Sequence, residues 1–229
     1  VIIEELEAIQ AEFADDRRTQ ISAVEGEIDM EGLIADEEMV ITITNGGYIK
    51  RLPVDTYRAQ RRGGVGVRGM QTKEDDWIEH LITASTHDYV LFFTSFGKVY
   101  RAKAYTLPIG TRDSKGRALV NVLPLREGER VMAAFTTRDY TEGKYLVFGT
   151  RKGTVKKTEF LAYNTILKAD GIIAINLREG DELVDVRLTD GHDRILMVSK
   201  SGQAALFSEE KVRSMGRSAS GLIGMRLGG

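Results

Sequence analysis

The sequence predicts an all-β fold: a propeller-like array of four-stranded blades, preceded by a short N-terminal helix. Three observations support this prediction. A strand–turn–strand pattern recurs four times at intervals of about 50 residues. Two series of glycines keep an almost constant offset through all four copies. No helical period occurs inside a copy, so each copy is expected to be a small sheet that must stack on its neighbours to bury both faces.

Residues 1–38 differ from the rest of the chain. Ile2, Leu6, Ile9 and Phe13 fall at helical spacing, which predicts a helix over residues 1–13. No capping residue precedes this helix, so we expect it to continue a longer chain. The segment that follows has no helical period and is expected to be an acidic linker with one short strand at residues 33–34. We therefore divide the chain into residues 1–38, helix and linker, and residues 39–229, the array.

The net charge of −2 conceals an asymmetry between these two parts. Residues 1–38 contain thirteen acids and two bases, whereas residues 39–229 contain thirty bases and twenty-one acids. The array alone is therefore basic, and the near-neutral total does not argue against a polyanionic partner.

The first glycine series marks the turns of four hairpins. Each glycine follows a Thr-x-x or Ser-x-x sequence, which is typical of a short turn closed by a residue with positive φ. The glycines are Gly47, Gly97, Gly153 and Gly202. The first strands are expected at residues 39–44, 89–94, 145–150 and 194–199, and the second strands at 48–51, 98–101, 154–157 and 203–206.

The second glycine series lies 18 or 19 residues after the first and consists of Gly66, Gly116, Gly171 and Gly221. Short apolar segments follow it at residues 67–70, 119–123, 172–177 and 222–227. A third strand-like set occupies residues 77–84, 131–136 and 183–188. The strands are apolar without strict alternation, which predicts that both faces of each sheet are covered. Because the chain stops where another strand is due, we expect a truncated array of four visible blades.

Bases recur at equivalent positions of the copies in two sets. The first set, here called the hairpin bases, follows the turn glycines: Lys50, Arg51, Lys98, Arg101, Lys103, Lys156 and Lys157. The second set, here called the loop bases, flanks the second glycines: Arg58, Arg68, Arg112, Lys115, Arg117, Lys168, Lys211, Arg213 and Arg217. Equivalent positions lie on equivalent edges of an array, so these bases are expected to form a band around the perimeter. The band suits the phosphate backbone of duplex DNA, because few aromatic residues accompany it. The alternative is that strand-end bases only keep the sheet edges soluble.

One stretch, residues 60–69, is found in the first copy alone. It contains four glycines and no acid, and its arginines offer planar charged groups that suit phosphate. Glycine also lets a polyanion approach the backbone closely. The alternative is a surface loop without a binding role.

Several kinds of chemistry are not indicated. The chain has no cysteine, which excludes disulfides and fits a reducing cytoplasm. His80, His87 and His192 show no metal-ligand spacing, and the glycine loops lack the Lys-Ser/Thr and the helix of a phosphate-binding P-loop. No stretch is long and apolar enough to span a membrane. We expect no catalytic residue, no metal and no cofactor.

The stretch Gln60-Arg61-Arg62-Gly63-Gly64-Val65-Gly66 closely resembles the sequence box of the C-terminal domain family of DNA gyrase A subunits. Six of the seven positions match, and Val65 stands where the family usually has lysine. The resemblance covers the whole chain: residues 1–20 resemble the tail of the preceding DNA-cleavage domain, and residues 39–227 resemble successive blades of a β-pinwheel.

The resemblance implies a domain that wraps double-stranded DNA around a basic rim and so directs ATP-driven negative supercoiling. It implies two partners, the gyrase A cleavage domain and the gyrase B subunit, with the ATPase site, the catalytic tyrosine and the metal site in those other parts. The paralogous topoisomerase IV domain has a degraded box, so the near-intact box favours gyrase. A propeller scaffold that binds protein partners is the alternative from a different class.

Overall fold

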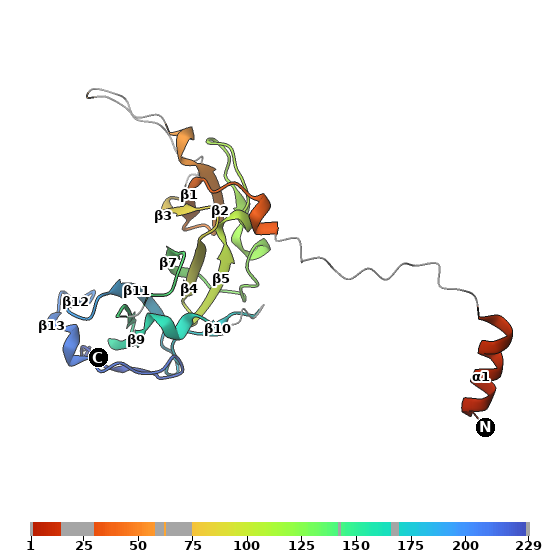
Figure 1. Cartoon of the computed structure of the whole chain (residues 1–229). Coiled ribbons are helices and arrows are strands. Elements are labelled where there is room, and N and C mark those ends of the chain that lie inside the picture. Colours follow the sequence, from red (N-terminus) through yellow and green to blue (C-terminus); the bar gives the residue numbers. More distant parts are fainter. Residues whose placement is uncertain are drawn as a thin grey trace. The chain divides into compact units, whose positions relative to one another are not determined.

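The computed structural model describes residues 2–14, 30–57, 62, 75–141, 143–165 and 170–227. The chain divides into two compact units, with the boundary between Leu33 and Ile34. The smaller unit contains helix α1 (Ile2–Phe13) and the 3-10 turn η1 (Met30–Leu33), and the larger unit contains strands β1 to β14 (Figure 1). None of the helices in the described ranges is long and apolar enough to cross a bilayer.

The predicted N-terminal helix is confirmed, whereas the strand predicted at residues 33–34 is wrong. Leu33 ends the turn η1, and the residues after it are held by polar contacts to the turn before strand β4. Thr86 donates its hydroxyl to the Ala35 carbonyl O at 2.7 Å, and the Ile34 carbonyl O lies 2.9 Å from His87 Nε2. Among the described residues, side-chain groups rather than a strand thus bind the backbone at Ile34 and Ala35.

Four hairpins form the centres of the sheets, as predicted. In each turn the glycine N–H donates to the carbonyl of the Thr or Ser three residues earlier, at 2.9–3.0 Å. The turn glycines have φ of 78°, 72°, 79° and 85°, a region that glycine enters without steric cost. The hairpin strands are β1 (Glu38–Thr44) and β2 (Tyr48–Pro53), β4 (Tyr89–Thr94) and β5 (Lys98–Lys103), β8 (Tyr145–Thr150) and β9 (Thr154–Glu159), and β12 (Arg194–Val198) and β13 (Ala204–Ser208).

Three of these hairpins are extended to four-stranded antiparallel sheets, here called A, B and C, with the strand orders β3-β1-β2-β6, β7-β4-β5-β10 and β11-β8-β9-β14. The strands that pair with β1, β4 and β8 are β3 (Ile78–Ser85), β7 (Val131–Thr137) and β11 (Leu183–Thr189). They confirm the third predicted strand set. Hairpin β12–β13, here called sheet D, is two-stranded within the described residues.

The fourth strand of each complete sheet comes from the following copy. These short strands are β6 (Arg117–Ala118), β10 (Ile172–Ile173) and β14 (Leu222–Ile223), and they pair with β2, β5 and β9. Each begins directly after a glycine of the second series. Consecutive copies are therefore joined by strand exchange as well as by stacking.

Gly116 explains why glycine is needed before an exchanged strand. Its φ is 80°, and a Cβ atom at this position would lie 2.4 Å from the Ile49 carbonyl O of β2. Gly221 repeats the arrangement against the Val155 carbonyl O of β9, at 2.6 Å and with φ of 85°. Each glycine thus combines a left-handed backbone with close contact to the strand of the preceding copy.

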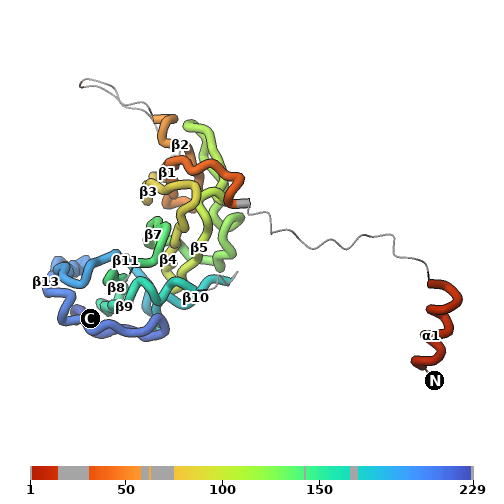
Figure 2. Tube along the Cα trace, in the orientation of Figure 1, coloured from red at the N-terminus to blue at the C-terminus, as the bar shows by residue number. Residues whose placement is uncertain are grey.

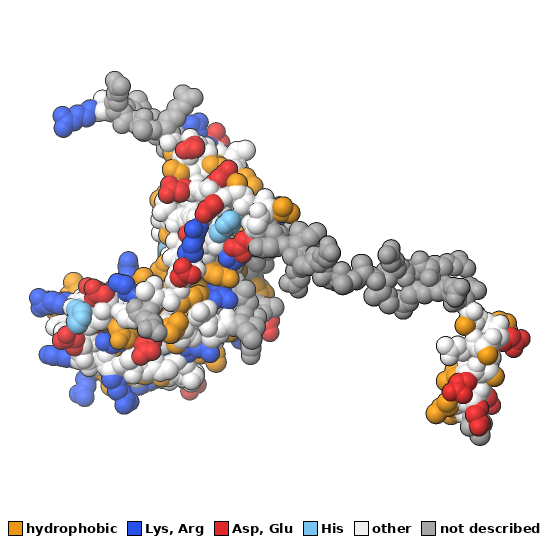
Figure 3. Space-filling model, in the orientation of Figure 1, with side chains coloured by type: hydrophobic (Ala, Val, Ile, Leu, Met, Phe, Trp, Pro, Cys, Tyr) orange, Lys and Arg blue, Asp and Glu red, His pale blue; other side chains and the backbone are white. Residues whose placement is uncertain are grey.

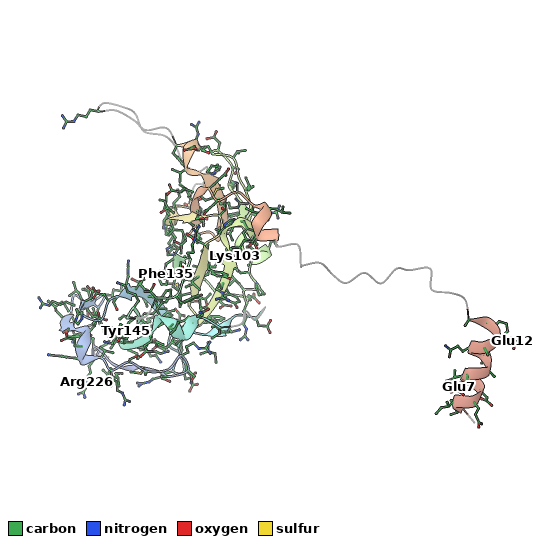
Figure 4. All side chains as sticks on the ribbon, viewed as in Figure 1. Glu7, Glu12, Lys103, Phe135, Tyr145 and Arg226 are labelled. Carbon is green, nitrogen blue, oxygen red and sulfur yellow. The ribbon has the colours of Figure 1, made fainter. Side chains whose placement is uncertain are left out.

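The core lies between successive sheets. Along β4, Val90 and Phe92 pack in the cluster between sheets A and B, whereas Leu91 and Phe93 pack in the cluster between sheets B and C. Both sets are almost fully buried, which confirms that the apolar runs belong to sheets covered on both faces. Phe135 of β7, labelled in Figure 4, packs on Phe93 with ring centroids 5.1 Å apart.

The perimeter side of each sheet carries short 3-10 turns, an exception to the prediction that the copies contain no helical segment. They follow the second hairpin strand of each copy and are η2 (Val54–Thr56), η3 (Ala104–Thr106), η5 (Phe160–Tyr163) and η6 (Glu209–Lys211), with η4 (Leu119–Asn121) after β6. On the opposite side, β7 lies between β3 and β11 (Figure 2). These three strands line an open channel of about 660 Å³.

Candidate nucleic-acid interface

The loops that connect the second hairpin strand to the exchanged strand lie at the perimeter and carry most of the loop bases. We call these segments rim loops: residues 104–116 in the second copy and 209–221 in the fourth. The corresponding segments of the first and third copies lie partly outside the described residues. The positions of both sets of bases relative to the rim loops decide which side chains can reach a polyanion.

Lys50, on β2, is fully buried and points under the rim loop of the second copy. Its Nζ donates to the carbonyl oxygens of Thr111, Arg112 and Ser114 at 3.0, 2.7 and 2.9 Å. Burial lowers the pKa of this ammonium, and the negative charge of Asp113 partly offsets this lowering. The three carbonyls use all three N–H groups of the ammonium.

The neighbouring Arg51 holds an earlier part of the same rim loop. Its Nε donates to the Leu107 carbonyl O at 2.8 Å and its terminal NH2 group to the Tyr105 carbonyl O at 2.9 Å. Its side chain is 8% exposed. Lys50 and Arg51 point to opposite faces of β2, yet both end on backbone oxygens of the second copy.

The third copy repeats this arrangement on β9. Lys156 is fully buried, and its Nζ donates to the Ala174 carbonyl O at 2.7 Å and to the Arg217 carbonyl O. Burial, assisted by the positive charge of Arg217, lowers the pKa of Lys156 to about 7. Lys157 donates to the Glu209 carbonyl O at 3.1 Å, with Nζ 4.8 Å from the ring centroid of Tyr145, which Figure 4 labels.

In the second copy the hairpin bases are half-buried and also bound. Lys98 donates to the Asp170 carbonyl O and the terminal NH2 group of Arg101 to the Thr165 carbonyl O, both at 2.9 Å. Lys103, labelled in Figure 4, lies 4.0 Å above the Tyr89 ring and donates to the His87 carbonyl O at 2.9 Å.

The prediction of an exposed perimeter band is therefore wrong for Lys50, Arg51, Lys156 and Lys157. Their charges are buried and satisfied by backbone carbonyls, because both faces of these sheets are covered. The sequence contained a signal for this placement. These bases lie inside apolar strands, whereas the loop bases lie in connecting segments or, for Arg117, at the start of a two-residue strand.

The loop bases in the described residues lie at the surface. Arg112, Lys115 and Arg117 are exposed in the second copy, and Lys211 and Arg213 in the fourth, while Arg217 is half-exposed. On the face drawn in Figure 3, Lys and Arg side chains project around the part of the array that contains β12 and β13. An open hollow of about 1100 Å³ is lined by Asn164 and Thr165 of the third copy and Arg217 and Ser218 of the fourth. These bases retain the geometry needed to contact an extended polyanion.

Most of the predicted box lies outside the described residues: Gln60, Arg61, Gly63, Gly64, Val65 and Gly66. The same holds for the loop bases Arg58, Arg68 and Lys168. Arg62, the described member of the box, is exposed.

One group of acids in the described residues brings ligand-type atoms together. Carboxylate oxygens of Asp190, Asp193 and Glu209 lie within 4.8 Å of one another. The buried Glu209 already accepts hydrogen bonds from the Thr189 hydroxyl at 2.7 Å and from the Asp193 backbone N–H at 2.8 Å. These bonds fix the turn before β12, in agreement with the interpretation of this acidic stretch as a turn.

Comparisons with known proteins agree with this architecture. The family described as DNA gyrase C-terminal domain, beta-propeller, matches residues 38–85, 88–138, 144–190 and 193–229. The DNA gyrase A subunit of Haemophilus influenzae is 46% identical over 227 residues, covering 99% of this chain and 26% of that protein. The DNA gyrase A subunit of Salmonella typhimurium is 44% identical over 229 residues, covering 100% of this chain and 26% of that protein. The chain thus spans about a quarter of the length of these curated relatives.

Solved structures give the same result. The C-terminal domain of a DNA topoisomerase IV superposes with a TM-score of 0.74 at 31% identity, covering 85% of this chain and 59% of that one. A DNA gyrase A C-terminal domain superposes with a TM-score of 0.62 at 26% identity, covering 83% of this chain and 61% of that one. Four family matches, one on each repeated copy, coincide with the four hairpins described above. The chain therefore belongs to the family of DNA gyrase C-terminal β-propeller domains.

Proposed function

We propose that this chain binds double-stranded DNA along its perimeter and wraps it with a fixed handedness. The observation that carries the proposal is that exposed bases occur in or directly beside the rim loops of both the second and the fourth copies: Arg112, Lys115 and Arg117, and Lys211 and Arg213. Bases repeated along a stack of sheets give contacts at successive points of a duplex. Contacts of this kind read the phosphate backbone and need no specific base sequence.

In the longer protein, the proposed role is to present a DNA crossing of one sign to a cleavage core. ATP-driven strand passage by the gyrase A cleavage domain and the gyrase B subunit then yields negative supercoils. Residues 1–38 form the helix and acidic linker that follow the cleavage domain. The proposed site of action is the bacterial chromosome in the cytoplasm, and the wrapping step needs no cofactor bound to this chain.

A second candidate is the corresponding domain of topoisomerase IV. The TM-score of 0.74 with a topoisomerase IV C-terminal domain favours it, whereas identities near 45% with gyrase A subunits favour gyrase. Transferring the chain to a gyrase A subunit that lacks this domain separates the two. Restored negative supercoiling supports the gyrase role, and decatenation or relaxation alone supports the topoisomerase IV role.

The direct test is the salt dependence of duplex binding. We expect the logarithm of affinity to fall with the logarithm of salt concentration by about 0.9 per phosphate contacted. Lys211→Ala combined with Arg213→Ala should therefore lower the slope by about 1.8. Arg151→Ala combined with Lys152→Ala removes the same charge from a hairpin turn, where both side chains are exposed, and should leave the slope unchanged.

A plasmid assay tests the wrap itself. A relaxed plasmid is incubated with the chain, religated and deproteinised, and its linking number is measured. A shift of one sign supports chiral wrapping. If duplex DNA does not bind at low salt, the scaffold alternative stands and the DNA proposal fails.

A further inference from the structure

Six of the seven hairpin bases, all except Lys103, follow one rule across three joints of the array: a base on the second hairpin strand donates to backbone carbonyls of the next copy. Lys50 and Arg51 reach the second copy, Lys98 and Arg101 the third, and Lys156 and Lys157 the fourth. The fourth copy has Ala205 and Leu206 at the positions of Lys50 and Arg51. The contact is therefore a repeated feature of the joints between copies.

The joint around Lys50 is the most complete. Five carbonyl groups of one rim loop, from Tyr105 to Ser114, receive hydrogen bonds from the two side chains of Lys50 and Arg51. A buried loop carbonyl without a donor is costly, so these two bases satisfy groups that a sheet would otherwise pair. The same rim loop carries the exposed Arg112 and Lys115, and the exposed Arg117 follows it at the start of β6.

Two simpler roles do not fit this geometry. A fully buried ammonium enclosed by three carbonyls, as at Lys50, cannot contact a phosphate without leaving its partners. It also contributes nothing to the solubility of a sheet edge. An apolar side chain of similar length would fill the space but would leave the loop carbonyls unpaired.

We propose that Lys50, Arg51, Lys156 and Lys157 are positioning residues for DNA binding, because they fix the rim loops of the following copies so that the loop bases face the duplex. This inference rests on the proposed function. It assigns the two sets of bases different tasks: the hairpin bases hold the loops, and the loop bases contact phosphate.

Spin labels test the holding role without DNA. The chain has no cysteine, so Asp113→Cys on the second copy and Ser218→Cys on the fourth each give one labelling site at a side chain that is at least partly exposed. Lys50→Met should increase the mobility of a label at residue 113 and leave a label at residue 218 unchanged. Lys156→Met should increase the mobility of a label at residue 218 and leave a label at residue 113 unchanged. Each substitution is the matched control for the other, and equal loosening of both labels by either one would contradict the proposal.

A double-mutant cycle tests the link to DNA. Replacing Arg112, Lys115 and Arg117 by alanine should lower the salt slope of duplex binding by about 2.7. Lys50→Met should lower affinity by no more than this triple variant, and adding it to the triple variant should cause no further loss. Additive losses would mean that Lys50 contacts the duplex itself and would overturn the proposal. Unchanged affinity for Lys50→Met with a mobile label at residue 113 would overturn it as well.

The two proposals fail in different ways. If the unaltered chain does not bind duplex DNA, the proposed function fails, and with it the positioning role, while the spin labels still report whether the hairpin bases hold the rim loops. If Lys50→Met does not fold, Lys50→Gln replaces it in both assays. Its amide keeps two N–H donors, so the same changes are expected in smaller size.

Discussion

Lys156 and Tyr163 donate to the same acceptor, the carbonyl oxygen of Ala174, at 2.7 and 3.0 Å. Both side chains are buried, and they come from β9 and from the turn η5 that follows it. In the described residues, the positively charged Arg217 faces Lys156. The ammonium of Lys156 therefore has carbonyl partners but also a neighbour of the same charge. This environment makes Lys156 sensitive to pH.

Stability should rise with pH between about 7 and 10 because of Lys156. Its pKa is about 7 in the fold, against the ordinary lysine value of 10.5 that applies to the unfolded chain, so in this interval the unfolded chain binds more protons. Below pH 7 both states are protonated, and the cost of the buried charge is fully present. Burial raises the pKa of Tyr163, which therefore stays neutral across the interval.

Urea unfolding at several pH values measures this effect. Relative to Lys156→Met, the unaltered chain should gain up to about 1.4 kcal/mol per pH unit in the interval. Lys200→Met, at an exposed turn, keeps Lys156 and should retain the original pH profile. A constant difference between the unaltered chain and Lys156→Met from pH 6 to 10 would contradict the expectation.

The exchanged strands can be probed with a pair of glycines that have almost the same φ. Gly47 has φ of 78° and open space around it, whereas Gly116 has φ of 80° and would place a Cβ 2.4 Å from the Ile49 carbonyl O. Gly47→Ala should lower the free energy of unfolding by about 1–2 kcal/mol, because alanine must adopt the left-handed backbone there. Gly116→Ala should lower the free energy of unfolding, measured with urea, by clearly more, because β6 must also move away from β2. Equal costs would show that the close approach does not contribute.

Phe93 should be among the costly positions of the core. It is fully buried and packs edge-on against Phe148 across the joint of sheets B and C, with ring centroids 5.8 Å apart. Phe93→Ala should lower the free energy of unfolding by about 3–5 kcal/mol. Phe96→Ala, in the adjacent turn where the ring is 42% exposed, should change it by less than about 0.5 kcal/mol. Similar losses at both positions would contradict the assignment of the core.

The box should act on supercoiling more than on affinity. In a gyrase A subunit that carries this domain, Arg61→Ala with Arg62→Ala should reduce negative supercoiling by more than it reduces duplex binding. Arg112→Ala with Lys115→Ala removes the same charge from a rim loop and should reduce both together. A uniform loss of affinity with unchanged supercoiling per bound molecule would make the box equivalent to the other loop bases.

The hairpins could be predicted from the sequence because their signals are local. A Thr or Ser three residues before a glycine defines both the hydrogen bond and the positive φ, as at Thr44 and Gly47. Strand exchange could not be predicted in the same way. The second glycine series indicates a special backbone at Gly116, but its partner, Ile49, belongs to another copy.

The candidate interface was predicted only in part. Recurrence indicated that the bases matter, but recurrence alone does not distinguish a cation that faces solvent from one that binds carbonyls. Lys50 and Lys115 both belong to the recurrent sets, and the first is buried while the second is exposed. The apolar runs did predict that both faces of each sheet are buried. This information separates a base within a strand, such as Lys50, from a base in a loop, such as Lys115.

The exchanged strands also impose an order on biosynthesis. Strand β2 cannot complete its pairing until Arg117 and Ala118 have left the ribosome, and β5 waits in the same way for Ile172 and Ile173. Each sheet therefore reaches its final width only when much of the next copy has been translated. Until then, the nascent chain presents an unpaired strand edge that can pair with other chains. Slow translation between β2 and β6, or between β5 and β10, would prolong that exposure.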